Sequence, residues 1–156
     1  MTEPRLQPLD GDDPELAALF AKGMNGPDGR PLHIFGTLAH HPDMLRRWMV
    51  FAAHVMAKNT LTDRDRELLI LRTGWNCRSR YEFSQHVVIA LRCGITEEEI
   101  DRVKLGPDAG WEGTDQLLLV AADQLHERSD LDDDTWAALT AAYSTDECIA
   151  AWRKVT

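Results

Sequence analysis

The sequence predicts an all-α fold, for three reasons. Apolar residues recur at helical spacing along most of the chain, and no segment alternates as a half-buried strand would. Helix-start signals precede the periodic segments, and glycine or proline separates them. The chain has 156 residues, of which 44% are hydrophobic, so it can bury a core. We expect one domain over residues 1–156, with a loose polar arm at 1–12.

Two helices are predicted before residue 60. Pro14 and Pro42 mark where they begin, because proline fits the first helical turn, where its missing N–H is not needed. Glycine, proline and aspartate indicate a loop between them. The predicted elements are a helix over 14–24, a loop over 25–31, a short apolar segment over 33–38 and a helix over 42–58.

Six further helices are predicted after residue 60. Ser79 with Glu82, and Thr96 with Glu99, match the capping box, in which a hydroxyl residue precedes a glutamate by three positions. The fold class is therefore an all-α bundle of about six to eight helices. The predicted ranges are 62–75, 79–93, 96–105, 112–128, 132–143 and 145–155.

The charge balance is acidic, with a formal net charge of -9 at pH 7. An acidic surface repels phosphate backbones, so we expect no nucleic-acid partner. The longest apolar run, residues 117–122, is far shorter than the roughly 20 residues that span a bilayer, so we expect no membrane partner. The polar N-terminus lacks the apolar core of a signal peptide, and the three cysteines form no CxxC motif. These features predict a cytoplasmic protein with reduced cysteines.

Two consecutive helices carry ionisable residues where a core is expected. The helix over 62–75 is apolar on most sides, which predicts burial, yet it contains Glu67 and Arg72. In the next helix Glu82 and His86 are four residues apart, so they share one face. We expect Glu67, Glu82 and His86 to lie together at or near the core.

Such a group of side chains suits proton transfer. Burial raises the pKa of a carboxyl group and a nearby cation lowers it, so a Glu–His pair in a cleft can hold one proton near neutral pH. His86 is the natural proton carrier, because the ordinary pKa of histidine lies closest to neutrality. Glu82 would orient or polarise His86, and Glu67 would be a second acid or base. The predicted catalytic residues are therefore His86, Glu82 and Glu67.

Each of these residues also has a purely structural interpretation. Glu82 can serve only the capping box, and His86 can be a hydrogen-bonded core histidine. Glu67 can form a buried ion pair with Arg72. The three side chains are also of types that bind zinc or iron, although one histidine and two carboxylates are a sparse ligand set. Composition and spacing leave these alternatives open.

Two strings carry a family resemblance. Residues 66–72 read RELLILR and residues 81–86 read YEFSQH. Together they resemble the signature of the carboxymuconolactone decarboxylase family, within the alkyl hydroperoxidase D-like superfamily. Shorter similarities extend the resemblance from about residue 32 to 143, at 38–42, 90–100, 123–126 and 136–139. The resemblance implies an alkyl hydroperoxidase D-like helical bundle that assembles as a homotrimer or homohexamer.

The resemblance also separates two branches of the superfamily. The peroxidase branch has a CxxC motif shortly before a histidine and a glutamate one helix earlier. Counted back from His86, the two cysteine positions hold Ser79 and Glu82, which cannot form a disulfide. Glu67 and His86 match the glutamate and histidine positions. Thiol peroxidase activity is therefore disfavoured, and the Tyr-Glu-aromatic-x-x-His pattern resembles the decarboxylase-like branch.

For function, the resemblance implies a lyase that needs no metal or other cofactor and transfers protons on a small lactone or carboxylate. A decarboxylation leaves a carbanion, so the site must stabilise negative charge and then supply a proton. Arg72, His40 and His41 are the predicted substrate-binding residues. The alternative is a non-catalytic binding or assembly protein on the same scaffold. The resemblance also implies a further helical segment beyond 145–155, which we expect to be absent from this chain.

Overall fold

The computed structural model describes residues 4–57 and 60–155, and these form helices joined by loops. Nine helices and no strands lie within the described ranges, where one isolated bridge joins Asn25 and Pro31. The all-α prediction is confirmed. The described residues hold more helices than the predicted six to eight, because the apolar segment at 33–38 is itself helical. No helix within these ranges has both the length and the apolarity to cross a lipid bilayer.

The chain divides into two compact units, Met1–Ala57 and Lys58–Thr156, which are described separately. The single domain over 1–156 stays a prediction. The first unit contains α1 (Pro14–Phe20), α2 (His33–Leu38) and α3 (Pro42–Ala57). Its core consists of five buried apolar residues, Leu19, Phe20, Met24, Ala39 and Leu45.

Part of the predicted loose arm packs against α2. The backbone N–H of Leu9 donates a hydrogen bond to the carbonyl of Gly36 at 3.0 Å. A Cβ at Gly36 would lie 2.6 Å from the carbonyl oxygen of Leu9, so only glycine permits this close approach. The helix α1 ends at Phe20, four residues earlier than predicted, and a turn leads on to the buried side chain of Met24.

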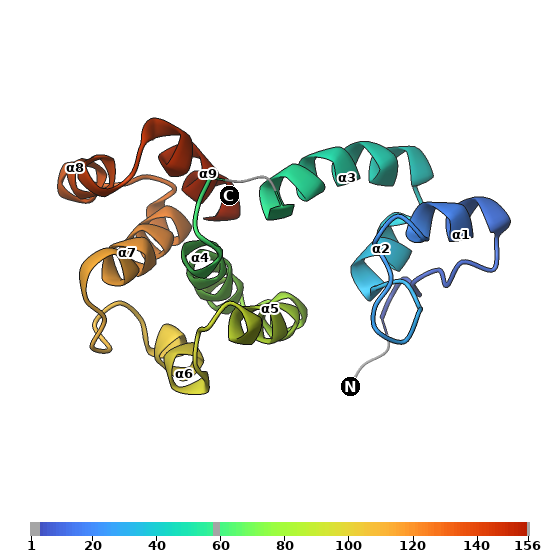
Figure 1. Ribbon diagram of the computed structural model, residues 1–156, viewed down its shortest axis with the longest axis horizontal. Helices are drawn as coiled ribbons and strands as arrows, with labels where there is room; N and C mark the ends of the chain where they lie inside the picture. Colours follow the sequence, from blue (N-terminus) through green and yellow to red (C-terminus); the bar gives the residue numbers. More distant parts are fainter. Residues whose placement is uncertain (1–3, 58–59, 156) are drawn as a thin grey trace. The chain divides into compact units, whose positions relative to one another are not determined.

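The second unit is built around α4 (Asp63–Asn76). Figure 1 shows α4 at the centre of this unit, with four of the other helices around it, whereas the helix Asp133–Ala142 packs against two of these four and lies at the edge. The other helices of the unit are α5 (Arg80–Arg92), α6 (Glu97–Leu105), α7 (Gly113–Arg128), α8 (Asp133–Ala142) and α9 (Thr145–Val155). All predicted helices of this part of the chain are present, with bounds that differ by a few residues at most.

The central position of α4 follows from its apolar surface. Leu68 and Leu71 pack with residues of α5 and α6, whereas Leu69 packs with α7 residues that include Leu118 and Ala122. Because α4 has buried neighbours on several sides, Glu67 in its second turn is also buried. The predicted burial of this helix is confirmed.

Caps and ion pairs fix the ends of α4 and its neighbours. Thr62 accepts a hydrogen bond from the backbone N–H of Asp65 and caps α4. The predicted capping box of α6 is confirmed, with Thr96 and Glu99 bonded reciprocally at 3.2 and 2.8 Å. Arg64 of α4 pairs with Glu99 and with Asp115 of α7, so one guanidinium connects three helices. These contacts hold the helix that carries Glu67 in a defined position.

Candidate functional site

Glu67 lies at the centre of the candidate site. Its side chain is fully buried in α4. One carboxylate oxygen, Oε1, accepts a hydrogen bond from Nε of Arg66 at 2.8 Å, and the other, Oε2, lies 2.7 Å from Nδ1 of His86. A buried carboxylate without partners would be strongly unfavourable, so these two contacts explain how Glu67 is accommodated in the core.

His86 connects the buried carboxylate to the surface. It lies on α5 and is itself buried, with its Nε2 atom 3.3 Å from Oε1 of Glu82 one turn earlier. The side chain of Glu82 is 41% exposed. The three residues therefore form a continuous carboxylate–imidazole cluster, Glu67–His86–Glu82, that runs from the core to solvent. The prediction that these side chains lie together is confirmed, whereas their catalytic role stays a prediction.

The two carboxylates determine the protonation state of His86. Burial alone would lower the pKa of the imidazole, but the hydrogen bonds to Glu67 and Glu82 outweigh it and raise this pKa to about 9. The hydrogen bond from His86 in turn lowers the pKa of Glu82. At neutral pH the cluster therefore holds an imidazolium that donates one N–H to each carboxylate.

Arg66 is a further member of the site that the sequence analysis did not single out. Besides Glu67, its guanidinium contacts Asp63 at 2.5 Å and the Sγ atom of Cys93 at 3.9 Å. Burial raises the pKa of the Cys93 thiol, which favours the neutral form. The sequence does contain an indication that Arg66 belongs to the site, because this charged residue stands directly beside Glu67 at the start of an apolar run.

Two of the structural interpretations are wrong. Glu67 does not pair with Arg72, because residues five positions apart on a helix point about 140° apart. The Ser79 side chain makes no capping hydrogen bond, so the predicted capping box of α5 is not formed. The ψ angle of Ser79 is 86°, compared with 161° at the working cap Thr96. Glu82 is thereby left to interact with His86.

The structure does not bring Arg72 to the carboxylate–imidazole cluster. Its guanidinium forms a two-point ion pair with Asp123 of α7, at 2.6 and 2.8 Å. It also donates a hydrogen bond to the carbonyl of Val103 at 2.8 Å, near the end of α6. These contacts give Arg72 a structural role, and substrate binding by this residue stays a prediction.

The other two predicted substrate-binding residues, His40 and His41, lie in the first unit. Nε2 of His40 is 2.9 Å from the carbonyl oxygen of Gln7. Nδ1 of His41 accepts a hydrogen bond from the backbone N–H of Met44 at 3.3 Å, in the first turn of α3. Both side chains thus have local partners, and their role in substrate binding also stays a prediction.

We also considered the side chains that bind metals. Within residues 4–57 and 60–155, no group of three or more histidine, cysteine, aspartate or glutamate side chains has an arrangement that could hold a metal ion. In the carboxylate–imidazole cluster, both imidazole nitrogens are directed at carboxylates.

Comparison of the sequence with protein-family models assigns the chain to a family. The model of the carboxymuconolactone decarboxylase family matches residues 42–123, just over half of the chain. The matched segment contains every residue of the carboxylate–imidazole cluster and Arg66. A comparison with curated proteins found no match. Membership is consistent with a decarboxylase-like or an alkyl hydroperoxidase-like role. The chain thus belongs to the carboxymuconolactone decarboxylase family.

Proposed function

We propose that this protein is a lyase that decarboxylates a small lactone or carboxylate by proton transfer and without a cofactor. The observation that carries the proposal is the position of the His86 imidazole, which is held between a fully buried and a partly exposed carboxylate. Perturbed pKa values in such clusters are typical of acid/base catalysts. The partly exposed Glu82 marks the end of the cluster that a substrate can reach.

In the proposed reaction, His86 is the general acid. Loss of carbon dioxide breaks a carbon–carbon bond and leaves its electron pair on the substrate as a carbanion or dienolate. His86 then transfers its Nε2 proton to that carbon and becomes neutral. The imidazole keeps the Nδ1 proton, which stays hydrogen-bonded to Glu67, and it regains the other proton from solvent beside Glu82. The net change is substrate plus one proton to product plus carbon dioxide.

The two glutamates have different proposed roles. Glu67 is fully buried and contacts Arg66 and His86, so it is a positioning residue that fixes the imidazole tautomer and stabilises its charge. Glu82 is ionised at neutral pH and partly exposed, so it can orient the Nε2 proton or accept a proton from a substrate carbon. The proposed catalytic residues are therefore His86 and Glu82.

The cysteines support the decarboxylase-like branch over a thiol peroxidase. The positions of the peroxidase motif hold Ser79 and Glu82. Cys77, Cys93 and Cys148 are free thiols, near the ends of α4 and α5 and in α9 respectively. A peroxidase that forms a disulfide needs two thiols in reach of each other, and the CxxC spacing that would provide them is absent from the sequence.

The ultraviolet absorbance of 4-carboxymuconolactone tests the proposal directly. Wild-type protein should consume this lactone, and His86→Ala should slow turnover by about 10²–10⁴-fold, as expected for loss of a general acid. Glu82→Gln should also slow it. His126→Ala is the matched control, because it removes an exposed histidine of α7 outside the cluster. Full turnover by both His86→Ala and Glu82→Gln would contradict the proposal.

One observation favours a second candidate, a non-catalytic binding or assembly protein. A cavity of about 550 Å³ in the second unit is lined by none of Glu67, Glu82 and His86, so a ligand bound there would not contact the proposed catalytic groups. Exposed Trp136 and Ile149 on α8 and α9 would suit contacts between copies, in line with the homotrimer or homohexamer that the family resemblance implies. If wild-type protein failed to turn over any of a panel of small lactones and carboxylates, this candidate would be preferred.

A further inference from the structure

The turn between α4 and α5 forms an open cavity of about 550 Å³. This volume lies within the range of small-molecule sites, roughly 300–1,000 Å³. Its lining includes two aromatic and two cationic side chains, Trp75, Phe83, Arg78 and Arg80. The cavity shares two helices with the carboxylate–imidazole cluster but no residue, so it requires its own explanation.

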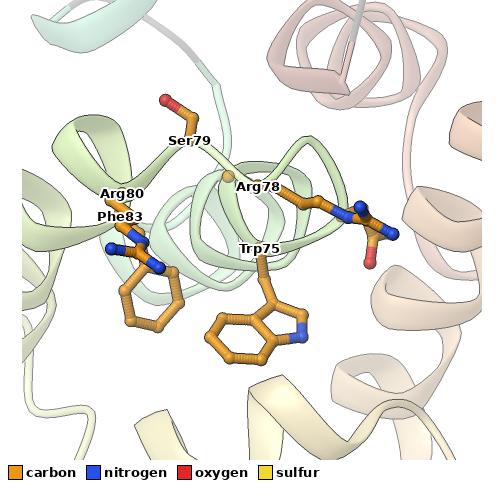
Figure 2. A pocket seen from close by; sticks show the side chains of 7 residues that line it. Trp75, Arg78, Ser79, Arg80 and Phe83 are labelled. Carbon is orange, nitrogen blue, oxygen red and sulfur yellow. The ribbon is translucent and has the colours of Figure 1, made fainter.

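One side of the cavity is aromatic. The rings of Trp75 and Phe83 have centroids 5.6 Å apart and are inclined by 59°. The indole of Trp75 is 45% exposed although it is among the largest apolar groups of the chain. In Figure 2 this indole extends between Phe83 and Arg80 on one side and Arg78 on the other. An exposed ring in this position offers a face on which a planar ligand can stack.

The other notable feature of the cavity is uncompensated positive charge. The side chains of Arg78 and Arg80 make no ion pair or hydrogen bond with another residue in the part of the chain that the structure describes. Arg64, Arg66 and Arg72 of α4 all pair with carboxylates. Both side chains are exposed to solvent, and together they would attract an anion to the cavity although the net charge of the chain is -9.

Lys104 adds a third cation at the same aromatic pair. Its ammonium nitrogen lies 5.6 Å from the ring centroid of Phe83 and 6.0 Å from that of Trp75. One exposed carboxylate, that of Asp101, is 2.6 Å from this nitrogen. Asp101 offsets the charge of Lys104, so the uncompensated positive charge at the cavity comes from Arg78 and Arg80.

The backbone at Arg78 also indicates that its side chain serves a purpose. Arg78 has a φ of 55°, in the left-handed region that glycine occupies most easily. Ser79 N–H bonds to the carbonyl of Gly74, and Arg78 N–H to that of Trp75, which is the Schellman arrangement at a helix C-terminus. Glycine is the usual residue at this position, so arginine costs stability there while it places a guanidinium at the cavity.

We propose that the α4–α5 cavity binds a planar organic anion of the aromatic carboxylate class. The ring of the ligand stacks on Trp75 beside Phe83, and its carboxylate pairs with Arg78, while Arg80, on the other side of the indole, adds to the attraction of the anion. An inorganic anion would leave the aromatic wall unused, and a neutral aromatic would leave the two cations unpaired. The proposal does not depend on chemistry at His86.

The test uses 2-naphthoate as the probe and 2-naphthamide as its neutral counterpart. Binding is followed in full-length protein by the NMR signal of the Trp75 indole N–H, assigned with Trp75→Phe. The carboxylate should shift this signal saturably, and the amide should bind about tenfold more weakly or worse, because it loses charge-assisted hydrogen bonds. Arg78→Ala should weaken naphthoate binding by a similar factor, and Arg80→Ala should weaken it less, because Arg80 attracts the carboxylate only from a distance.

Two further variants separate binding from folding and from overall charge. Arg78→Gly should raise the melting temperature, because glycine relieves the left-handed conformation, and yet it should weaken naphthoate binding. Arg92→Ala removes an exposed arginine near the C-terminal end of α5, away from the cavity lining, and should leave binding unchanged. The proposal is overturned if naphthoate does not shift Trp75, if naphthamide binds equally well, or if Arg92→Ala weakens binding as much as Arg78→Ala.

Discussion

Replacing Glu67 by glutamine should lower the pKa of His86 and change how the stability of the protein depends on pH. Glu67 is the nearer of the two carboxylate partners, at 2.7 Å compared with 3.3 Å for Glu82, and it is fully buried. Burial alone lowers the pKa of His86, and the two carboxylates together raise it to about 9. Without the charge of Glu67, burial should dominate and this pKa should fall well below 9.

The magnitude follows from the difference between the folded and unfolded pKa values of His86. A rise from 6.5 to about 9 corresponds to about 3 kcal/mol, at about 1.4 kcal/mol for each pKa unit. Because the folded-state pKa lies above the unfolded value, this contribution is fully present below pH 6.5 and is lost as the pH rises through 9. Wild-type protein should therefore lose up to about 3 kcal/mol of unfolding free energy across this window through His86.

Two measurements check this prediction. An NMR titration of the His86 ring gives its pKa, and urea unfolding at pH 6 and pH 9.5 gives the change in stability. Other groups that titrate in this pH window are present in both proteins. The difference in pH-dependent stability between wild type and Glu67→Gln therefore reports the contribution of the carboxylate–imidazole cluster alone. Glu82→Gln should have the smaller effect, because its contact is longer and partly exposed. A wild-type His86 that titrates near its ordinary pKa, or equal pH dependence in wild type and Glu67→Gln, would refute the reasoning.

Two further predictions concern the scaffold. Arg72→Ala should lower the unfolding free energy by about 3 kcal/mol, because it leaves the Asp123 carboxylate at the α4–α7 contact without its cation. Urea unfolding measures this change. As a control, Arg128→Ala breaks a more exposed ion pair and should lower the unfolding free energy far less. Ser129→Gly should stabilise the protein by about 0.5 kcal/mol, because Ser129 ends α7 with a φ of 57°; an unchanged or lower melting temperature would contradict this.

The sequence allowed the helices and the central part of the site to be predicted, because both depend on local spacing. Glu82 and His86 lie one turn apart on any helix, and a short turn between consecutive helices brings Glu67 near them. The helical segment at 33–38 was harder to recognise, because six residues are too few for a periodic pattern.

The errors arose where the partner of a residue depends on tertiary structure or on the backbone of a neighbour. Asp123, the partner of Arg72, lies 51 positions further along the chain, and no local pattern connects the two. The capping box at Ser79 and Glu82 was correct as a pattern of residue types. It fails because the left-handed residue Arg78 precedes Ser79, and Ser79 itself has a ψ of 86° rather than the extended value of a capping residue.

The arrangement of charges gives a physical reason to connect the cluster with chemistry rather than with stability. A buried ion pair seldom stabilises a core more than apolar residues of similar size would, so a sequence selected for stability alone has little reason to keep Glu67 and His86 there. A purely structural pair would also need no contact with solvent. Here Glu82, which is 41% exposed, extends the pair to the surface. The cluster thus combines a fully buried carboxylate with a partly exposed one, and the proposed role of His86 as a general acid rests on this arrangement.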